Sequence, residues 1–132
     1  MAPDTFRIAT RWQDLDGNGH VNHAVVFTYL EEARDTYLRR HGIDRDEYLV
    51  GRCSVEFKGE IVPGEEAVTV EVGISELGTK SLRTGERILD PAGAIVVEGE
   101  FGLVLWDPAA RVTRPITDAE RASLTGTEVV PG

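Results

Sequence analysis

The segment His23–Gly42, HAVVFTYLEEARDTYLRRHG, decides the fold because it is the long stretch of the chain with helical periodicity. It contains no proline, and its only glycine is its last residue. Apolar side chains recur at the spacing of one helix face, with charged residues between them; these apolar residues are Val26, Tyr29, Leu30, Ala33, Tyr37 and Leu38. The pattern predicts one amphipathic helix, which at about 1.5 Å per residue would be roughly 27 Å long and could cross a small sheet.

Both ends of this segment carry residues that start and stop helices. Asn22 precedes it, and an asparagine there can accept a hydrogen bond from the first turn, so Asn22 is the predicted N-cap. Gly42 follows a basic last turn, where glycine readily takes the left-handed conformation that closes a helix. We therefore expect the helix to begin near His23 and to end just before Gly42.

The rest of the chain has the two-residue period of strands. Thr5–Trp12 alternates before the helix, and four more such segments follow it, centred on 53–57, 68–74, 81–89 and 94–106. Asp90–Gly93 is typical of the turn of an antiparallel hairpin. This order predicts an α+β fold in which one long central helix packs against an antiparallel five-stranded sheet, with the last four strands in hairpin-like succession.

A single helix covers only one face of such a sheet. The other face is therefore expected to be polar, narrow or buried in an oligomer. Residues 118–124 predict a short C-terminal helix, and residues 125–132 a loose tail. A length of 132 residues fits a single domain spanning 1–132.

The composition disfavours several classes of function. The 14 Lys and Arg residues against 23 Asp and Glu give a net charge of −9, which argues against nucleic acid or an anionic membrane as partner. No apolar run could span a bilayer and no secretion signal is evident, so a cytoplasmic protein is expected. Cys53, the single cysteine, excludes an internal disulfide and is predicted to be buried. The motifs of serine hydrolases and nucleotide-dependent enzymes are missing from the sequence.

The stretch Asp14–Val25, DLDGNGHVNHAV, begins like a calcium-binding EF-hand loop. That loop requires a glutamate at its twelfth position and a helix before it, but Val25 stands at that position and a strand pattern precedes the stretch. His20 and His23 could bind a metal as a pair, yet no third ligand lies near them in the sequence. We therefore expect no metal site here.

What remains is a carboxylate, Asp16, in a glycine-flanked turn just before the helix. A helix start offers unpaired N–H groups and partial positive charge, which suit a carbonyl oxygen that becomes negative during attack. A thiol, with a pKa of about 8.5, can leave as thiolate without a strong proton donor. A thioester is therefore a suitable substrate for a site that offers only one carboxylate and one helix start. Asp16 can act as general base on water or can attack the acyl carbon to form a mixed anhydride, and both routes remain open.

The run Arg11–Arg34, RWQDLDGNGHVNHAVVFTYLEEAR, resembles the signature of the hotdog-fold acyl-CoA thioesterases related to 4-hydroxybenzoyl-CoA thioesterase. The resemblance extends over the chain, because strand, central helix and four strands recur in that order. It implies that Asp16 is the catalytic carboxylate and that the amide near His23 polarises the thioester carbonyl. The chain departs from the family in having His23 where asparagine is common and Val26 where an aromatic residue is common.

The resemblance also implies the surroundings of the substrate. The residues expected to line it at the helix start are Gly19, His20, Val21, Asn22 and Val26. In the segment ELGTKSLR, Lys80 and Arg83 are expected to meet the phosphates of coenzyme A, and Thr79 or Ser81 its pantetheine arm. No cofactor is implied beyond the coenzyme A of the substrate.

The same resemblance implies self-association as a dimer or tetramer, with active sites between subunits and an acyl-CoA or acyl-carrier thioester as substrate. Glu31 and Glu32 are the alternative catalytic carboxylates, because other hotdog thioesterases carry a catalytic glutamate within the helix. Two other functions stay open. One is a hydratase or dehydratase using His20 with Asp16, and the other is a non-catalytic acyl-CoA-binding module.

Overall fold

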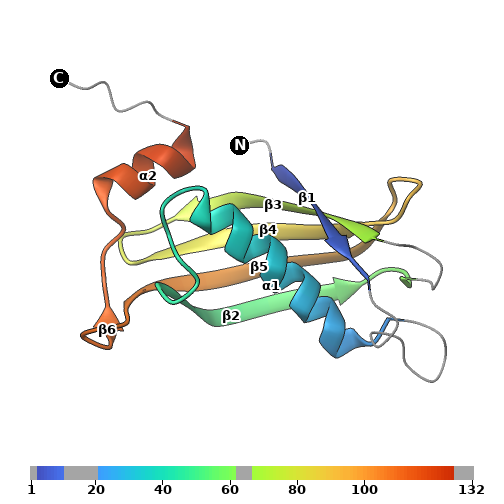
Figure 1. The fold of residues 1–132 in the computed structure, drawn as a ribbon, viewed down its shortest axis with the longest axis horizontal. Helices are drawn as coiled ribbons and strands as arrows, with labels where there is room; N and C mark the ends of the chain where they lie inside the picture. The colour runs from blue at the N-terminus through green and yellow to red at the C-terminus, as the bar shows by residue number, and fades with distance from the viewer. Residues whose placement is uncertain (1–2, 11–20, 62–66, 127–132) are drawn as a thin grey trace.

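The computed structural model describes residues 3–10, 21–61 and 67–126. Six strands and two helices lie within these residues, and Figure 1 labels them. In chain order they are β1 (Asp4–Ala9), α1 (His23–Arg39), β2 (Tyr48–Phe57), β3 (Ala67–Leu77), β4 (Ser81–Leu89), β5 (Ile95–Asp107), β6 (Val112–Thr113) and α2 (Asp118–Thr125). The α+β prediction is confirmed.

The strands form one antiparallel sheet in the order β1-β3-β4-β5-β2, with β6 added beside β5. The sheet has six strands where five were predicted, because the chain after β5 turns back and pairs two residues with it. The hairpin-like succession holds for β3, β4 and β5 but is wrong for β2. That strand pairs with β5 at the far edge of the sheet instead of with β3.

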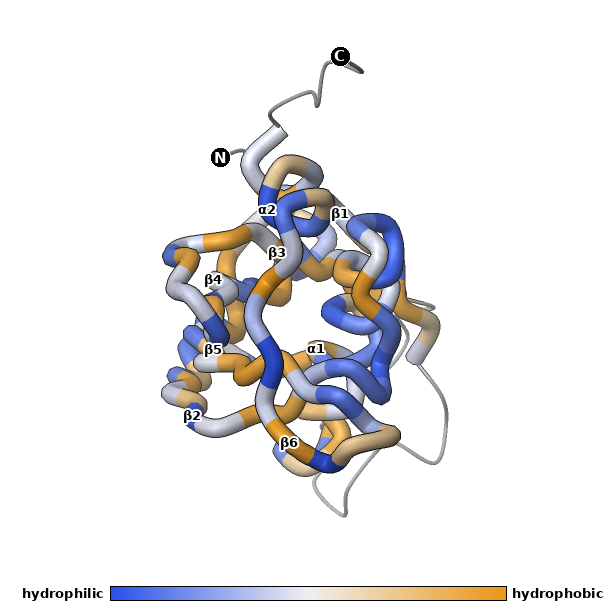
Figure 2. Tube along the Cα trace, turned by 90° about the vertical axis from the view of Figure 1, so that its left-hand side faces the viewer, coloured by the Kyte–Doolittle hydropathy of each residue, from blue (hydrophilic) through white to orange (hydrophobic). Residues whose placement is uncertain are grey.

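Helix α1 crosses one face of the sheet, and the strands curve around it (Figures 1 and 2). Its predicted apolar face is the buried one. Asn22 caps the first turn as predicted, with its side chain accepting from the Ala24 N–H at 2.8 Å. Gly42 follows the end of the helix with a φ of 84°, and the Ile43 N–H reaches back to the Leu38 carbonyl at 3.0 Å. Asn22 and Gly42 therefore begin and end the helix as predicted.

The opposite face of the sheet is polar. Arg83 lies 3.4 Å from Glu76 and 3.5 Å from Glu100, and Arg87 lies 3.6 Å from Glu98. These side chains are partly exposed, and their charges are arranged so that each cation lies beside at least one carboxylate. Water can therefore solvate the face that the helix does not cover. A polar second face was one of the three arrangements that the sequence predicted for a sheet covered by a single helix.

Edge strand β2 corrects the prediction for Cys53. The alternation of Cys53, Val55 and Phe57 indicated a buried face, but Cys53 is exposed, and Tyr48 is the only buried residue of the strand. The reason is that β2 is the outermost strand and has a neighbour on one side only. Of the three residues on that side, Val55 is partly buried against the core, whereas Cys53 and Phe57 are exposed.

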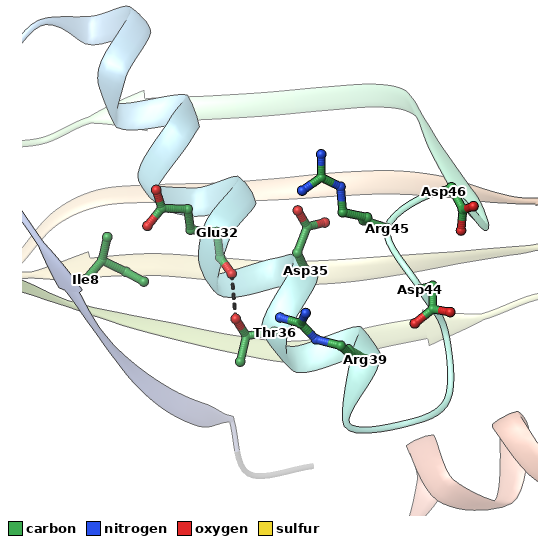
Figure 3. A pocket seen from close by; sticks show the side chains of 8 residues that line it. All are labelled: Ile8, Glu32, Asp35, Thr36, Arg39, Asp44, Arg45 and Asp46. Carbon is green, nitrogen blue, oxygen red and sulfur yellow. Dashed lines mark hydrogen bonds between the residues drawn. The ribbon is translucent and has the colours of Figure 1, made fainter.

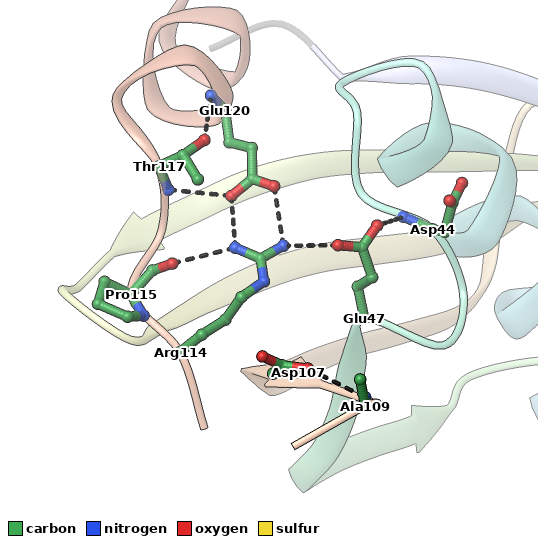
Figure 4. Close-up of polar contacts among 8 residues, drawn as sticks. All are labelled: Asp44, Glu47, Asp107, Ala109, Arg114, Pro115, Thr117 and Glu120. Atoms are coloured by element: carbon green, nitrogen blue, oxygen red, sulfur yellow. Dashed lines mark hydrogen bonds and ion pairs between the residues drawn. The ribbon is translucent and has the colours of Figure 1, made fainter. Parts of the chain in front are cut away.

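The C-terminal helix α2 is fixed to the sheet by a cluster of charged groups (Figure 4). Arg114 donates to both carboxylate oxygens of Glu120 at 2.8 Å and to Glu47 at 3.1 Å. Thr117 and Glu120 form a capping box at the helix start. Burial acts to raise the pKa of Glu120, but the hydrogen bonds from Arg114 and Thr117 outweigh it and hold that pKa below its usual value. The helix runs through Thr125, and residues 127–132 lie outside the described residues.

Candidate active site

The first turn of α1 leaves one backbone donor available. Its N-cap, Asn22, accepts three hydrogen bonds: its side chain accepts from the Ala24 N–H at 2.8 Å, and its carbonyl from Val25 at 3.0 Å and Val26 at 3.2 Å. Within the part of the chain that the structure describes, the N–H of His23 has no acceptor. His23 is exposed, so this N–H is a donor at the positive end of a helix that a ligand oxygen can use.

Backbone hydrogen bonds fix where this donor lies relative to the sheet. The Val21 N–H donates to the Ile61 carbonyl at 3.2 Å, just before α1 begins. The Val96 carbonyl near the start of β5 accepts from Lys58 at 2.8 Å and Gly59 at 3.1 Å, just after β2 ends. The helix start therefore lies at the end of the sheet where β2 finishes and β5 begins (Figure 1).

The other residues predicted around the helix start divide into two groups. Asp16, Gly19 and His20 lie outside the described residues, so the structure gives no position for the predicted catalytic carboxylate. Val21 and Val26 are both buried and belong to the hydrophobic core. Val26 therefore packs between the helix and the sheet.

The predicted coenzyme A segment lies at the opposite end of the sheet; it comprises Thr79, Lys80, Ser81 and Arg83. The Lys80 carbonyl accepts from the Leu105 N–H at 2.9 Å, near the end of β5, whereas the helix start is anchored near Val96. At about 3.3 Å per residue, these two points on β5 are roughly 30 Å apart. Within one subunit the structure does not bring this segment together with His23.

The alternative carboxylates of the helix, Glu31 and Glu32, are both exposed. The carboxylate that contacts α1 from below is Glu86 of β4, which sequence reasoning missed. It accepts two hydrogen bonds from Arg34, at 2.7 and 2.9 Å, and one from Thr84 at 2.6 Å. Burial acts to lower the pKa of Arg34, but its hydrogen bonds and charge contact with Glu86 raise that pKa above its ordinary value. The pair is satisfied and enclosed, so its role is to hold the helix on the sheet.

A sizeable hollow lies elsewhere, along the solvent side of the second half of α1 (Figure 3). It has a volume of about 600 Å³ and is lined by Ile8, Glu32, Asp35, Thr36, Arg39, Asp44, Arg45 and Asp46. Asp35 is twelve residues beyond His23, which in a helix is about 18 Å. This open, charged groove is therefore separate from the helix start.

One group of potential metal ligands occurs in the described part of the chain. Asp44, Asp46 and Glu47 offer oxygens within 4.8 Å of one another, at the end of the chain segment that links α1 to β2. Glu47 already pairs with Arg114 at 3.1 Å. The cluster is remote from His23 and has no connection to the site at the helix start.

The structure is an antiparallel sheet that curves around one long helix, and the first residue of that helix has an unpaired backbone N–H. Such an N–H can polarise an acyl carbonyl for nucleophilic attack, which is the chemistry of acyl-transfer enzymes. Comparisons with known proteins agree. The sequence pattern of the Thioesterase-like superfamily matches residues 10–124. Among curated proteins, no sequence is similar enough to count as a match.

Solved structures supply close relatives. A thioesterase from Thermus thermophilus, complexed with coenzyme A and Zn, is 31% identical, with 96% of this chain and 95% of that chain covered and a TM-score of 0.81. A proposed thioesterase from Pseudomonas aeruginosa is 33% identical over 90% of this chain and 95% of that one, with a TM-score of 0.81. A predicted thioesterase from Bacillus stearothermophilus is 27% identical over 99% and 100%, with a TM-score of 0.84.

The chain belongs to the thioesterase-like superfamily. It has the hotdog fold and is a thioester hydrolase, as the resemblance implied. Neither helix in the described part of the chain is long and apolar enough to cross a membrane.

Proposed function

We propose that this protein hydrolyses acyl-CoA thioesters to a carboxylic acid and free coenzyme A, with Asp16 as general base or nucleophile. The observation that carries the proposal is the His23 N–H, the amide of the first turn of α1 that Asn22 leaves unpaired. A thioester carbonyl oxygen that accepts from this N–H becomes more negative as the carbonyl carbon is attacked. The interaction therefore strengthens in the transition state, which is the requirement for catalysis.

In the general-base route, the carboxylate of Asp16 takes a proton from water while the water oxygen bonds to the acyl carbon. The carbon–sulfur bond then breaks, the thiolate of coenzyme A leaves, and the proton can return to it. In the nucleophilic route, an Asp16 oxygen bonds to the acyl carbon first and the thiolate leaves. Water then hydrolyses the mixed anhydride to regenerate the aspartate. Neither route requires a metal or a redox cofactor.

We further propose that the active unit is a dimer or a pair of dimers working in the cytoplasm. The distance along β5 between Lys80 and the helix start supports a shared site, because coenzyme A can contact both regions only if they come from different subunits. Lys80 and Arg83 of one subunit would then face the phosphates of a substrate whose carbonyl lies at His23 of the other.

The test is thiol release from short, long and aromatic acyl-CoAs by the wild type, Asp16→Asn and Asp14→Asn. Asp16→Asn should lower kcat by about 10²- to 10⁴-fold, the usual contribution of general acid–base catalysis. Asp14→Asn is the matched control, because it removes a carboxylate from the same turn, and it should keep most of the activity. The proposal is wrong if the wild type releases no thiol from any substrate or if Asp16→Asn is as active as the wild type.

The same reaction run for one turnover in ¹⁸O-labelled water gives a positive test of the nucleophilic route. Label in the side chain of Asp16 identifies that route, because it enters when water attacks the aspartyl carbonyl of the mixed anhydride; attack at the acyl carbonyl instead places the label in the product acid, as the general-base route does. Mass spectrometry of the peptide that contains Asp16 reads this directly.

A further inference from the structure

A serine and a histidine meet where the C-terminal helix α2 lies beside the end of α1 (Figure 1). The Oγ of Ser123 is 2.7 Å from Nδ1 of His41. The mechanism proposed above does not use this pair, because α1 is 17 residues long and the two ends of such a helix are about 25 Å apart. Two groups with acyl-transfer chemistry of their own therefore lie well away from His23 and the substrate carbonyl.

The hydroxyl of Ser123 does not make the hydrogen bond that is common for its place in a helix. A serine or threonine within a helix can donate to the carbonyl four residues earlier, and Thr125 of the same helix does so toward Arg121 at 2.9 Å. Among the described residues, the Ser123 hydroxyl has one partner, the imidazole of His41. A neutral imidazole accepts this bond through Nδ1, which is the arrangement in which a base takes a proton from a hydroxyl.

Both members of the pair are held by their surroundings. The His41 ring packs against the edge of the Tyr37 ring, with the centroids 4.8 Å apart and the planes at 62°, and Tyr37 is buried. On α2, Leu124 next to Ser123 is buried, and Arg121 donates to a carbonyl of the turn between β3 and β4 at 2.7 Å. Packing thus orients the base toward the hydroxyl, as a nucleophile–base pair requires.

Ser123 differs from the other serines of the chain in this contact alone. The chain contains four serines, and all of them are exposed; the other three are Ser54, Ser75 and Ser81. Within the part of the chain that the structure describes, Ser123 is the one whose hydroxyl contacts a histidine. A serine hydroxyl without a base is a weak nucleophile, and an adjacent base activates it by taking its proton as the new bond forms. Ser123 is therefore the serine expected to react with an electrophile.

We infer that Ser123 is a covalent modification site for activated acyl donors, with His41 as the base. Such donors are esters and thioesters whose leaving group departs without a proton. The Ser123 Oγ bonds to the acyl carbon while His41 Nδ1 takes the hydroxyl proton. The bond from that carbon to the leaving oxygen or sulfur breaks, and the leaving group departs with its electron pair as a phenolate or thiolate. His41 then releases the proton to water, and the product is an O-acyl serine on α2.

The modification is limited to one acyl group per chain, because the acylated Oγ has no proton left for His41 to take. The same loss removes a hydrogen bond between α2 and the end of α1. The inference does not rest on thioester hydrolysis at Asp16, since the two sites share no residue. An acyl donor can therefore react at Ser123 whether or not the protein hydrolyses it elsewhere.

Acetylation measured by peptide mass spectrometry tests the inference. The parent protein is Asp16→Asn, so that the reaction proposed for Asp16 does not consume the donor. It is incubated with 4-nitrophenyl acetate or, separately, with acetyl-CoA. Ser123 should be acetylated at least about tenfold faster than the internal controls Ser54, Ser75 and Ser81, because these are exposed serines of the same chain that have no base beside them.

His41→Gln in the same background separates a base from a hydrogen-bond partner. The glutamine carbonyl can still accept from Ser123, but it cannot take a proton. Acetylation of Ser123 should therefore slow by about 10²-fold, the lower end of the usual contribution of general acid–base catalysis. The comparison of serines within the parent protein needs no change in the pair, so it decides the question even where His41→Gln does not fold.

Selective acetylation of Ser123 by both donors supports the whole class, and acetylation by one donor alone assigns the site to that kind of ester. Two results overturn the inference: Ser123 acetylated no faster than the other serines with either donor, or Ser123 acetylated as fast in His41→Gln as in the parent. Thiol release by the wild type is a separate measurement. A protein that acetylates Ser123 but releases no thiol contradicts the hydrolytic function and leaves the modification site standing.

Discussion

Arg34 lies on the buried face of α1, where only 2% of it is exposed, and its guanidinium donates to Glu86 at 2.7 and 2.9 Å. The same guanidinium carbon lies 4.0 Å from the centre of the Phe101 ring. Thr84 supplies a further donor to the carboxylate, so both charges are fully partnered inside the core. The result is a polar tie between the central helix and the strands beneath it.

Removing only one partner of the Arg34–Glu86 pair should destabilise the protein, because the remaining charge would be buried without its partner and without water. Arg34→Met should lower the free energy of unfolding by about 3–5 kcal/mol, measured by urea denaturation. Arg83→Met is the matched control: Arg83 also lies beside two glutamates, but on the exposed face. It should change the stability by at most about 1 kcal/mol.

A second comparison identifies the cause. Replacing Arg34 and Glu86 together by methionine and leucine removes both charges and should restore much of the stability that the single change loses. If Arg34→Met unfolds at the same urea concentration as the wild type, the pair does not hold the helix in place.

Sequence reasoning did not find the pair of Arg34 and Glu86. Glu86 lies 52 residues from Arg34 along the chain, and only the fold brings the two side chains together. One signal was available: Glu86 takes an inward position on a strand whose other inward residues, Leu82, Thr84 and Ile88, are buried. A lone carboxylate in such a row indicates a buried cation opposite, although it cannot say which one.

At the scale of elements, α1 is the part that the sequence predicts best, because its apolar face and both end signals are local. The neighbours of β2 were not predictable in this way. Alternation tells which residues of a strand share a face but not which strand lies beside it, and β2 and β3, although consecutive in the chain, are separated by β4 and β5 in the sheet. Cys53 was misplaced for the same reason, since its burial depended on β2 being an inner strand.

The end of α1 offers a test of backbone conformation alone. Gly42 has a φ of 84°, and a Cβ added there would meet nothing within 4 Å. Gly42→Ala should therefore destabilise the protein by about 1–2 kcal/mol, the cost of the left-handed conformation for a residue with a side chain. Gly85→Ala on β4 is the control, because its Cβ would also meet nothing within 4 Å but its φ lies outside the strained region.

Gly85→Ala is expected to stabilise the protein slightly, by about 0.4–1 kcal/mol, through loss of freedom in the unfolded chain. The two substitutions add the same methyl group. If Gly42→Ala lowers the thermal unfolding temperature and Gly85→Ala raises it, the difference reports the cost of the left-handed backbone conformation at Gly42. Equal effects from both would show that the conformation of Gly42 does not matter to the end of the helix.

The molecule as a whole leaves an edge open. Among the described residues no strand pairs with the outer side of β2, which carries Leu49 and Val50 at 46% and 47% exposed. The opposite edge, β1, is shorter and alternates buried with exposed residues. An unpaired edge strand with apolar side chains is a template for pairing with another strand, and a second copy of β2 would satisfy it.

A charge on that edge should therefore dissociate the protein. Val50→Lys is expected to weaken self-association at least about tenfold in sedimentation equilibrium, because pairing would desolvate the new ammonium group. Thr5→Lys adds the same charge to an exposed position on β1, and should leave the oligomer intact. Thiol release should fall with dissociation in Val50→Lys alone, because His23 of one subunit would lose the Lys80 and Arg83 region of the other. A wild type that sediments as a monomer, or a monomeric Val50→Lys with full activity on acyl-CoA, would show that one subunit contains the whole site and would rule out the shared arrangement.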